Sequence, residues 1–174
     1  MRIFPAACLL LVLAGCSKPA PPAQPITYTH PRHKFSLTFP PGWKLEPDPA
    51  PDMALKATAP ERNTGGVFGL KKHPKPPPFQ GTPEWDAYKV DLRRRAETVR
   101  GTALETIEDG VISLRHAVIT TSTTDGPGGK EVVVVVAQVF GVDDVYTLAL
   151  STEARDRAKM VPVLMAIVQS LQLP

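Results

Sequence analysis

Hydrophobic and polar residues alternate in the stretch HKFSLTFPPGW, residues 33–43. Phe35, Leu37 and Phe39 are separated by polar residues, a period of two that places these apolar side chains on one face of a strand. Pro-Pro-Gly then ends the strand with turn chemistry, and Trp43 begins the return of the chain. Two further short strands are predicted, at Met53–Thr58 and Gly66–Lys71.

A helix is predicted after the proline-rich stretch HPKPPPFQGTP. Thr82 is a suitable N-cap, and Pro83 suits the first helical position. The following residues repeat apolar side chains at spacings of three and four, which lines up one hydrophobic stripe on a helix. Gly101 marks the expected end. The stripe consists of Trp85, Tyr88, Leu92, Ala96 and Val99.

Three strands are predicted in the second half of the chain. The first runs from about Val111 to Thr121, and the turn cluster TTDGPGG reverses the chain into the strand EVVVVVAQVF. A turn at Gly141–Asp144 leads to the strand Val145–Leu150. The five successive valines, Val132–Val136, do not alternate with polar residues, so we expect their strand to be covered on both faces.

The last segment, Ser151–Gln172, has the pattern of a helix, in which Pro162 predicts a kink or a new start. The chain therefore contains about six or seven strands and two main helices. This order predicts an α+β protein, a mostly antiparallel sheet with helices packed on it. The apolar face of the last helix is expected to contain Ala158, Val161, Met165, Val168 and Leu171.

The chain begins with one basic residue, Arg2, and an apolar run from Ile3 to Leu13. The run is too short to span a membrane, which needs about 20 apolar residues. Its length and the small residues after it are typical of a secretory signal peptide. We therefore expect residues 1–15 to direct export and to be removed.

Leu13-Ala14-Gly15-Cys16, at the end of this run, resembles the lipobox of bacterial lipoproteins. The resemblance implies a diacylglyceryl group on the Cys16 sulfur, cleavage before Cys16, and acylation of the new amino terminus. Two or more acyl chains make a stable membrane anchor. Ser17 resembles the residue type that lets lipoproteins of Gram-negative bacteria reach the outer membrane. The expected location is the cell envelope, anchored to the outer membrane and facing the periplasm.

A proline-rich stalk follows the lipidated cysteine, at residues 16–25. Its composition favours extended polyproline II, so the nine residues after Cys16 reach about 28 Å. Residues 26–174 have the length of one ordinary domain and contain no internal repeat. We therefore expect a signal peptide, a lipidated stalk and a single globular domain.

Charge and cysteine content argue against two further classes of function. The chain has 20 basic and 17 acidic residues, and loss of Arg2 with the signal peptide leaves 19 basic residues. So small an excess does not indicate nucleic-acid binding. Cys8 leaves with the signal peptide and Cys16 carries lipid, so neither a disulfide nor a thiol nucleophile is expected.

The stretch HKFSLTFPPGWK, the middle helix, the valine-rich strands and the closing IVQSLQL together resemble the PsbP-like families. These include an extrinsic protein of photosystem II and small bacterial lipoproteins of the DcrB sort. The chain has Ser170-Leu171 where those families often have Ser-Phe. The resemblance implies an α-β-α sandwich around a mostly antiparallel sheet, used mainly for binding and assembly and without a shared catalytic site.

Histidines and paired carboxylates are the candidates for chemistry. His30 and His33 lie three apart, but two imidazoles are an incomplete zinc site, so we expect them to be exposed where a strand begins. His116 is in phase with Ile112, Leu114 and Val118 and is expected to face the core with a hydrogen bond. The acidic pairs Glu108-Asp109 and Asp143-Asp144 are expected at turns, where adjacency alone does not indicate acid-base catalysis. We therefore expect no catalytic, metal or cofactor site.

Two surface features are candidates for contact with a partner or with lipid. Arg93, Arg94 and Arg95 could bind anionic headgroups or an acidic protein surface, or simply form the solvated face of a helix. Phe79 lies beside a polyproline ridge that partners can recognise, or in a plain surface connector.

The sequence thus predicts a non-catalytic, membrane-anchored envelope lipoprotein that binds or helps assemble another envelope component. An alternative is a small-ligand or ion-binding lipoprotein with its site between sheet and helix. No enzyme activity and no nucleic-acid partner are expected.

Overall fold

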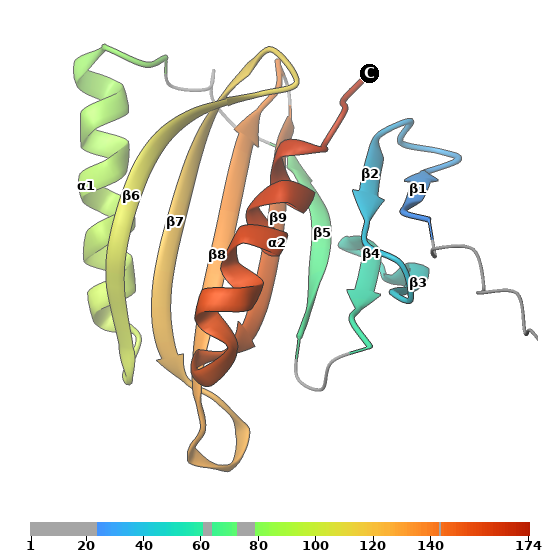
Figure 1. Cartoon of the computed structure of the whole chain (residues 1–174). Helices are drawn as coiled ribbons and strands as arrows, with labels where there is room; N and C mark the ends of the chain where they lie inside the picture. The colour runs from blue at the N-terminus through green and yellow to red at the C-terminus, as the bar shows by residue number, and fades with distance from the viewer. Residues whose placement is uncertain (1–23, 61–63, 73–78, 143) are drawn as a thin grey trace, which may run out of the picture.

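An antiparallel sheet forms the middle layer of the molecule (Figure 1). The computed structural model describes residues 24–60, 64–72, 79–142 and 144–174. Within these residues the sheet has seven strands, a separate hairpin has two, and two α-helices pack on the strands. The strands of the sheet are β3 (Lys44–Ala50), β4 (Met53–Thr58), β5 (Gly65–Lys72), β6 (Thr102–Ile112), β7 (Arg115–Asp125), β8 (Glu131–Phe140) and β9 (Asp144–Glu153).

The strand order is β3-β4-β5-β9-β8-β7-β6, and each neighbouring pair is antiparallel. Hairpins make most connections, but β5 lies beside β9 rather than beside β6. Helix α1 (Pro83–Thr98) carries the chain from the middle of the sheet to its far edge. The first and second halves of the described chain therefore share one sheet.

One face of the sheet is covered by the hairpin β1 (Ile26–Thr29) and β2 (Ser36–Phe39) and by helix α2 (Arg157–Gln169), which lie side by side. Backbone hydrogen bonds between Ser36 and Gln172, at 2.9 and 3.0 Å, join the hairpin to the segment after α2. The predicted alternation along β2 is confirmed. The buried core of this face includes Phe35, Leu37, Phe39, Phe68, Leu148, Leu150, Leu164, Ile167 and Val168.

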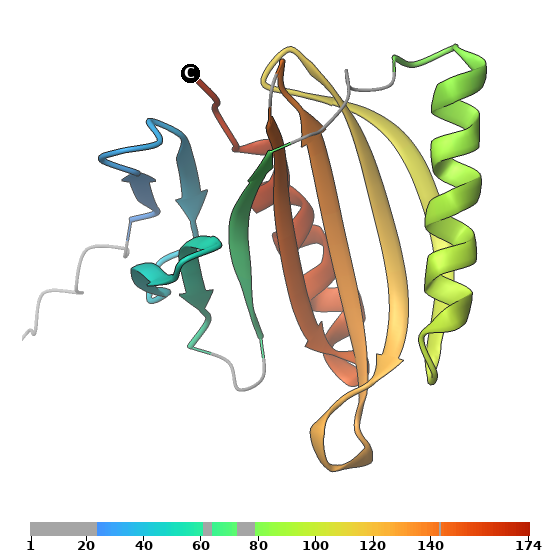
Figure 2. The same cartoon turned by 180° about the vertical axis from the view of Figure 1, so that it is seen from behind.

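The opposite face is covered by α1, but only toward the β6 edge (Figure 2). Trp85 is fully buried there against Val118, Phe140 and Val145, with Tyr88 at the margin. The α+β class and the three-layer arrangement predicted from the sequence are confirmed. The third layer, however, is narrower than the sheet.

Helix α1 begins as predicted. The Thr82 hydroxyl accepts a hydrogen bond from the backbone N–H of Trp85 at 3.3 Å, and Pro83 occupies the first turn. The predicted stripe is only partly used: Trp85 is buried, Tyr88 and Leu92 are half-buried, and Val99 lies exposed beyond the helix end. The helix therefore packs on the sheet mainly through Trp85, Tyr88 and Leu92.

The predicted single strand over Val111–Thr121 is wrong. Ser113 and Leu114 form a two-residue turn between β6 and β7, so the segment belongs to two strands. Both residues have positive φ values, 52° and 61°. Such turns usually contain Asn-Gly, and without that signal the sequence reads as a continuous strand.

The prediction that the valine-rich strand is covered on both faces is also wrong. In β8 the side chains of Val133 and Val135 are fully buried under α2, whereas those of Val132, Val134 and Val136 are only half-buried. The second set faces the side of the sheet that α1 leaves open.

The last helix is shorter than predicted. Residues 151–153 still belong to β9, and α2 runs from Arg157 to Gln169 without a new start at exposed Pro162. The predicted face is rotated, since Ala158 is exposed. Of the predicted face, Val168 and Leu171 are buried as expected. The other buried side chains of the helix are Met160, Leu164 and Ile167.

Candidate functional site

Figure 2 shows that α1 lies at the β6 edge and leaves the rest of this face of the sheet uncovered. A groove lies on the uncovered part. Its volume is about 730 Å³, and strands β4, β5, β8 and β9 form its floor. Val67, Val132, Val134 and Ala149 contribute half-buried apolar side chains. In register, Val67 and Ala149 are direct partners. The groove is therefore an apolar surface on a rigid sheet.

Charged side chains border this groove. Lys56 pairs with Glu46 at 3.3 Å, and Lys130 contacts the carboxylate of Glu153 at 2.9 Å. Glu153 is buried and also contacts Arg155 at 2.6 Å. The buried carboxylate of Glu153 is therefore paired with two cations, which compensate for its loss of hydration. The arrangement suits contact with an apolar surface that has a polar edge, rather than proton transfer.

The space between the sheet and the layer that includes α2 is filled. Leu164, Ile167 and Val168 are almost completely buried, and the small gap near Leu37 and Leu148 leaves no room for a water molecule. A ligand site between sheet and α2 therefore has no support in the described residues. The open groove lies on the other face.

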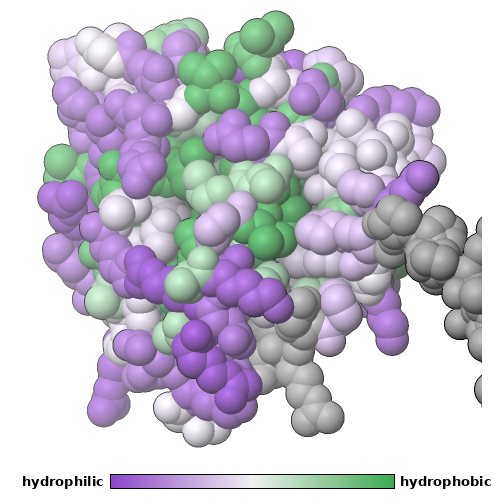
Figure 3. All heavy atoms as spheres, in the orientation of Figure 1, coloured by the Kyte–Doolittle hydropathy of each residue, from purple (hydrophilic) through white to green (hydrophobic). Residues whose placement is uncertain are grey.

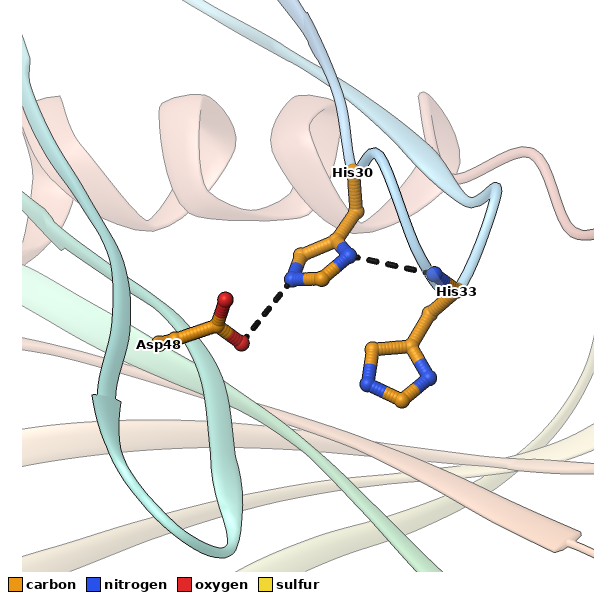
Figure 4. Close-up of side chains that lie close together, drawn as sticks. All are labelled: His30, His33 and Asp48. Carbon is orange, nitrogen blue, oxygen red and sulfur yellow. Dashed lines mark hydrogen bonds and ion pairs between the residues drawn. The ribbon is translucent and has the colours of Figure 1, made fainter.

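A second cluster brings His30, His33 and Asp48 together (Figure 4). One potential metal-ligating atom from each residue lies within 4.8 Å of the others. His30 follows β1 and is fully buried, which corrects the prediction that it is exposed; His33 is exposed. Burial follows from the tight turn, in which the ring of His30 stacks on Phe35 at 5.1 Å between ring centroids.

The hydrogen bonds of His30 argue against a metal site. Its Nδ1 accepts the backbone N–H groups of Arg32 and His33 at 3.2 and 3.1 Å, so the ring proton is on Nε2, which donates to Asp48 at 3.1 Å. A histidine that binds metal through Nε2 needs its other nitrogen to donate a proton. Here that nitrogen faces two donors, so the cluster does not fit a metal ion.

The cluster instead connects the β1–β2 turn to β3. Asp48 projects from a bulge in β3, where its φ is 47°, and its carboxylate also contacts Arg32 at 2.7 Å. The hydrogen bond from Arg32, helped by that from His30, lowers the pKa of Asp48. Sequence reasoning missed Asp48, although prolines on both sides of it were a signal for an irregular strand.

The predicted contact residues do not form one surface. Arg94 contacts Asp91 at 2.5 Å, and Arg95 contacts the same carboxylate. The three arginines lie exposed in the second half of α1, whereas Phe79 precedes its first turn. At about 1.5 Å per residue, the helix rises roughly 17 Å between Pro83 and Arg94, so Phe79 and the arginines lie toward different ends of α1.

The remaining predicted residues lie outside the groove and outside the His30 cluster. His116 shares a face with Val118, but it is only half-buried, its Nδ1 has no hydrogen-bond partner among the described residues, and Leu114 is exposed. Glu108-Asp109 lies inside β6 rather than at a turn, and Asp109 accepts a hydrogen bond from the indole of Trp85 at 2.8 Å.

Several predicted features lie outside the described residues or at their margin. Cys16, the signal peptide and most of the stalk belong to residues 1–23, and Asp143 is also outside. Asp144 is half-buried at the start of β9. Among the helices that are described, none has the length and apolar character needed to cross a membrane.

Comparison with known proteins identifies the fold. No protein-family model matches the sequence, and no curated protein matches it significantly. Among solved structures, cyanobacterial PsbP from Synechocystis superposes with a TM-score of 0.61 at 13% identity, covering 92% of this chain and 99% of that one. The chain therefore has the PsbP-like fold, as its sequence predicted.

Two bacterial proteins have the same architecture. LpqN of Mycobacterium tuberculosis, described as involved in cell envelope biogenesis, has a TM-score of 0.58 at 13% identity, covering 88% of this chain and 93% of LpqN. Protein PA94 of Pseudomonas aeruginosa has a TM-score of 0.52 at 17% identity, covering 86% of this chain and 96% of PA94. At these identities the similarity establishes the fold alone.

Proposed function

We propose that this chain is a non-catalytic bacterial lipoprotein with a PsbP-like domain of the DcrB sort, which binds or helps assemble another envelope component. The observation that carries the proposal is the open half of the sheet, where valines of β5 and β8 remain half-exposed beside a groove. A sheet normally buries its apolar face against another element. A partner that covers this face completes the third layer.

The sequence supports the location of this function. The apolar run, the lipobox-like Leu13-Ala14-Gly15-Cys16 and Ser17 fit a protein anchored by lipid to the outer membrane and facing the periplasm. LpqN, which has the same fold, is described as involved in cell envelope biogenesis, and its description agrees with an envelope role. The proline-rich stalk would hold the binding surface away from the lipid.

A photo-crosslinking experiment tests the proposal in native membranes. A photoreactive phenylalanine analogue at Val134, in the groove, should capture one specific envelope protein. The same analogue at Val90, a 69% exposed position on α1 outside the groove, is the matched control and should not. Capture of nothing from Val134 at normal abundance, or the same adducts from both positions, would contradict the proposal.

A small apolar ligand is a second candidate, because the groove volume lies in the range of roughly 300–1,000 Å³ that is usual for ligand sites. Native mass spectrometry of the purified protein distinguishes the two. A bound small molecule that is lost when Val134 is replaced by Lys would favour the ligand, whereas a crosslinked protein favours the assembly role.

A further inference from the structure

Exposed apolar side chains gather at one end of the sheet. Leu114, in the β6–β7 turn, is 98% exposed, and Val142, in the β8–β9 turn, is 80% exposed. Phe79 and Val111 are each 58% exposed. We call these four side chains the apolar tip. In Figure 3 hydrophobic residues reach the surface at the upper end of the molecule, where Figure 1 places these turns.

The four residues of the apolar tip belong to one surface. Strands β7 and β8 are neighbours, and the ends of these strands place the two turns next to each other. Val111 pairs with His116 across β6 and β7. The ring of His116 lies edge-on to Phe79, with 6.1 Å between centroids. Single exposed apolar residues need no explanation, but a contiguous group indicates a contact surface.

Folding does not account for leucine at position 114. Its φ of 61° lies in the left-handed region that favours glycine or asparagine. Its side chain is almost fully exposed, so the fold gains no burial from it. A residue that strains the backbone and contributes nothing to the core is better explained by a contact outside the chain.

A basic residue accompanies the apolar tip. Arg115 follows Leu114, and its guanidinium donates to the Pro174 carbonyl at 2.6 Å. A cation beside an exposed apolar turn suits contact with anionic headgroups. Arg93–Arg95 lie in the second half of α1, away from the turns.

We propose that the apolar tip inserts into the headgroup region of the bilayer that carries the lipid anchor. The inference rests on the anchored lipoprotein proposed above. A turn with an aliphatic side chain at its end and the cation Arg115 beside it fits a deformable lipid surface, because apolar burial and charge attraction together drive interfacial binding. The groove lies on the open face of the sheet, where it stays free for a partner. A stalk that reaches about 28 Å ties the domain to the bilayer without fixing which end of the domain faces the lipid.

Site-specific fluorescence tests the inference with the full lipidated protein, reconstituted in vesicles of phosphatidylethanolamine and phosphatidylglycerol. Leu114→Cys and Val142→Cys each introduce one free thiol, because in the proposed mature form Cys8 is lost and the Cys16 sulfur carries the diacylglyceryl group. The matched control is Val90→Cys, on the exposed side of α1. A polarity-sensitive label should be quenched by acyl-chain spin labels at least threefold more at the two turn positions than at Val90.

Three results would overturn the inference. Equal quenching at all three positions would show that the apolar tip does not contact lipid. A spectral change of the label on Leu114→Cys that depends on protein concentration and not on vesicles would show that a second copy of the chain covers this position. An unmodified amino terminus in mass spectrometry would overturn the proposed lipid anchor, and this inference with it. An acylated protein whose labels at the two turns are not quenched would overturn this inference alone and leave the proposed anchor standing.

Discussion

Every polar atom of the His30 ring has a partner, and these partners come from two separate parts of the chain. Nδ1 accepts two backbone N–H groups of its own turn, and Nε2 donates to Asp48 in the β3 bulge. The ring is also fully buried beside Phe35 and Tyr28. Polar groups that are buried and fully bonded help to specify one conformation.

Replacing His30 should therefore destabilise the fold. His30→Ala leaves a cavity and unpaired groups, and should lower the free energy of unfolding by about 2–4 kcal/mol in urea titrations. His33→Ala, at the exposed end of the same cluster, should change it by no more than about 0.5 kcal/mol. A Zn²⁺-dependent rise in Tm that His30→Ala abolishes would refute our exclusion of a metal site.

Helix α1 attaches to the sheet through few contacts. Trp85 fills the space over Val118 and Phe140, and its indole donates to Asp109 in β6. Lys89 reaches the same carboxylate at 3.1 Å, and these two hydrogen bonds, that from Trp85 first, lower the pKa of Asp109. The second half of the helix is largely exposed. The position of the third layer thus depends on its first two turns.

Variants of Trp85 should distinguish the contribution of its packing to the free energy of unfolding from that of its hydrogen bond. Trp85→Ala should cost about 3–5 kcal/mol of unfolding free energy, and Trp85→Phe, which keeps most of the ring but loses the indole N–H, about 1–2 kcal/mol. Val90→Ala, on the exposed side of α1, should cost less than about 0.5 kcal/mol. Hydrogen exchange should show α1 losing protection in Trp85→Ala; an unchanged α1 would contradict this account.

Across the whole molecule, ion pairs connect the layers. Arg157 begins α2 and contacts Glu105 in the edge strand β6 through both guanidinium nitrogens, with one distance of 2.7 Å. The hydrogen bonds from Arg157 and then Thr123 lower the pKa of Glu105 to about 2. The pKa values of Asp48, Asp91 and Asp109 are lowered as well, each by hydrogen bonds from cationic or N–H donors.

These depressed pKa values predict a dependence of stability on pH. A carboxyl that titrates lower in the folded state stabilises it above the unfolded pKa, and this contribution is lost as the pH falls from about 4.5 toward 2. Because the Glu105 pair is partly solvent-exposed, we expect it to contribute about 1 kcal/mol or less. In Glu105→Gln the unfolding free energy should therefore fall less steeply as the pH is lowered from about 4.5 toward 2.

A double-mutant cycle provides the control for this prediction. Arg157→Gln should weaken the same pH dependence of the unfolding free energy. The double variant should differ little from either single variant. Additive effects of the two substitutions would show that Glu105 and Arg157 do not act as a pair.

Local patterns predicted much of this fold. The alternation at Phe35, Leu37 and Phe39 and the Thr82 cap act between near neighbours in the chain, so the sequence contains their full cause. The β6–β7 turn was missed because Ser113 and Leu114 adopt left-handed conformations that these residue types rarely signal. Asp48 was missed because its partner His30 lies 18 positions away.

By itself the sequence determined the α+β class, the strand and helix types, and the features at Cys16 and Ser17 on which the proposed anchor rests. Only the tertiary structure decided that α1 covers part of one face, that Val132 and Val134 are left half-exposed, and that Leu114 and Val142 come together at one end. The physical reason is that periodicity and capping depend on residues a few positions apart. Coverage of a sheet depends on strand order and on where a helix docks, and these follow from packing between distant segments.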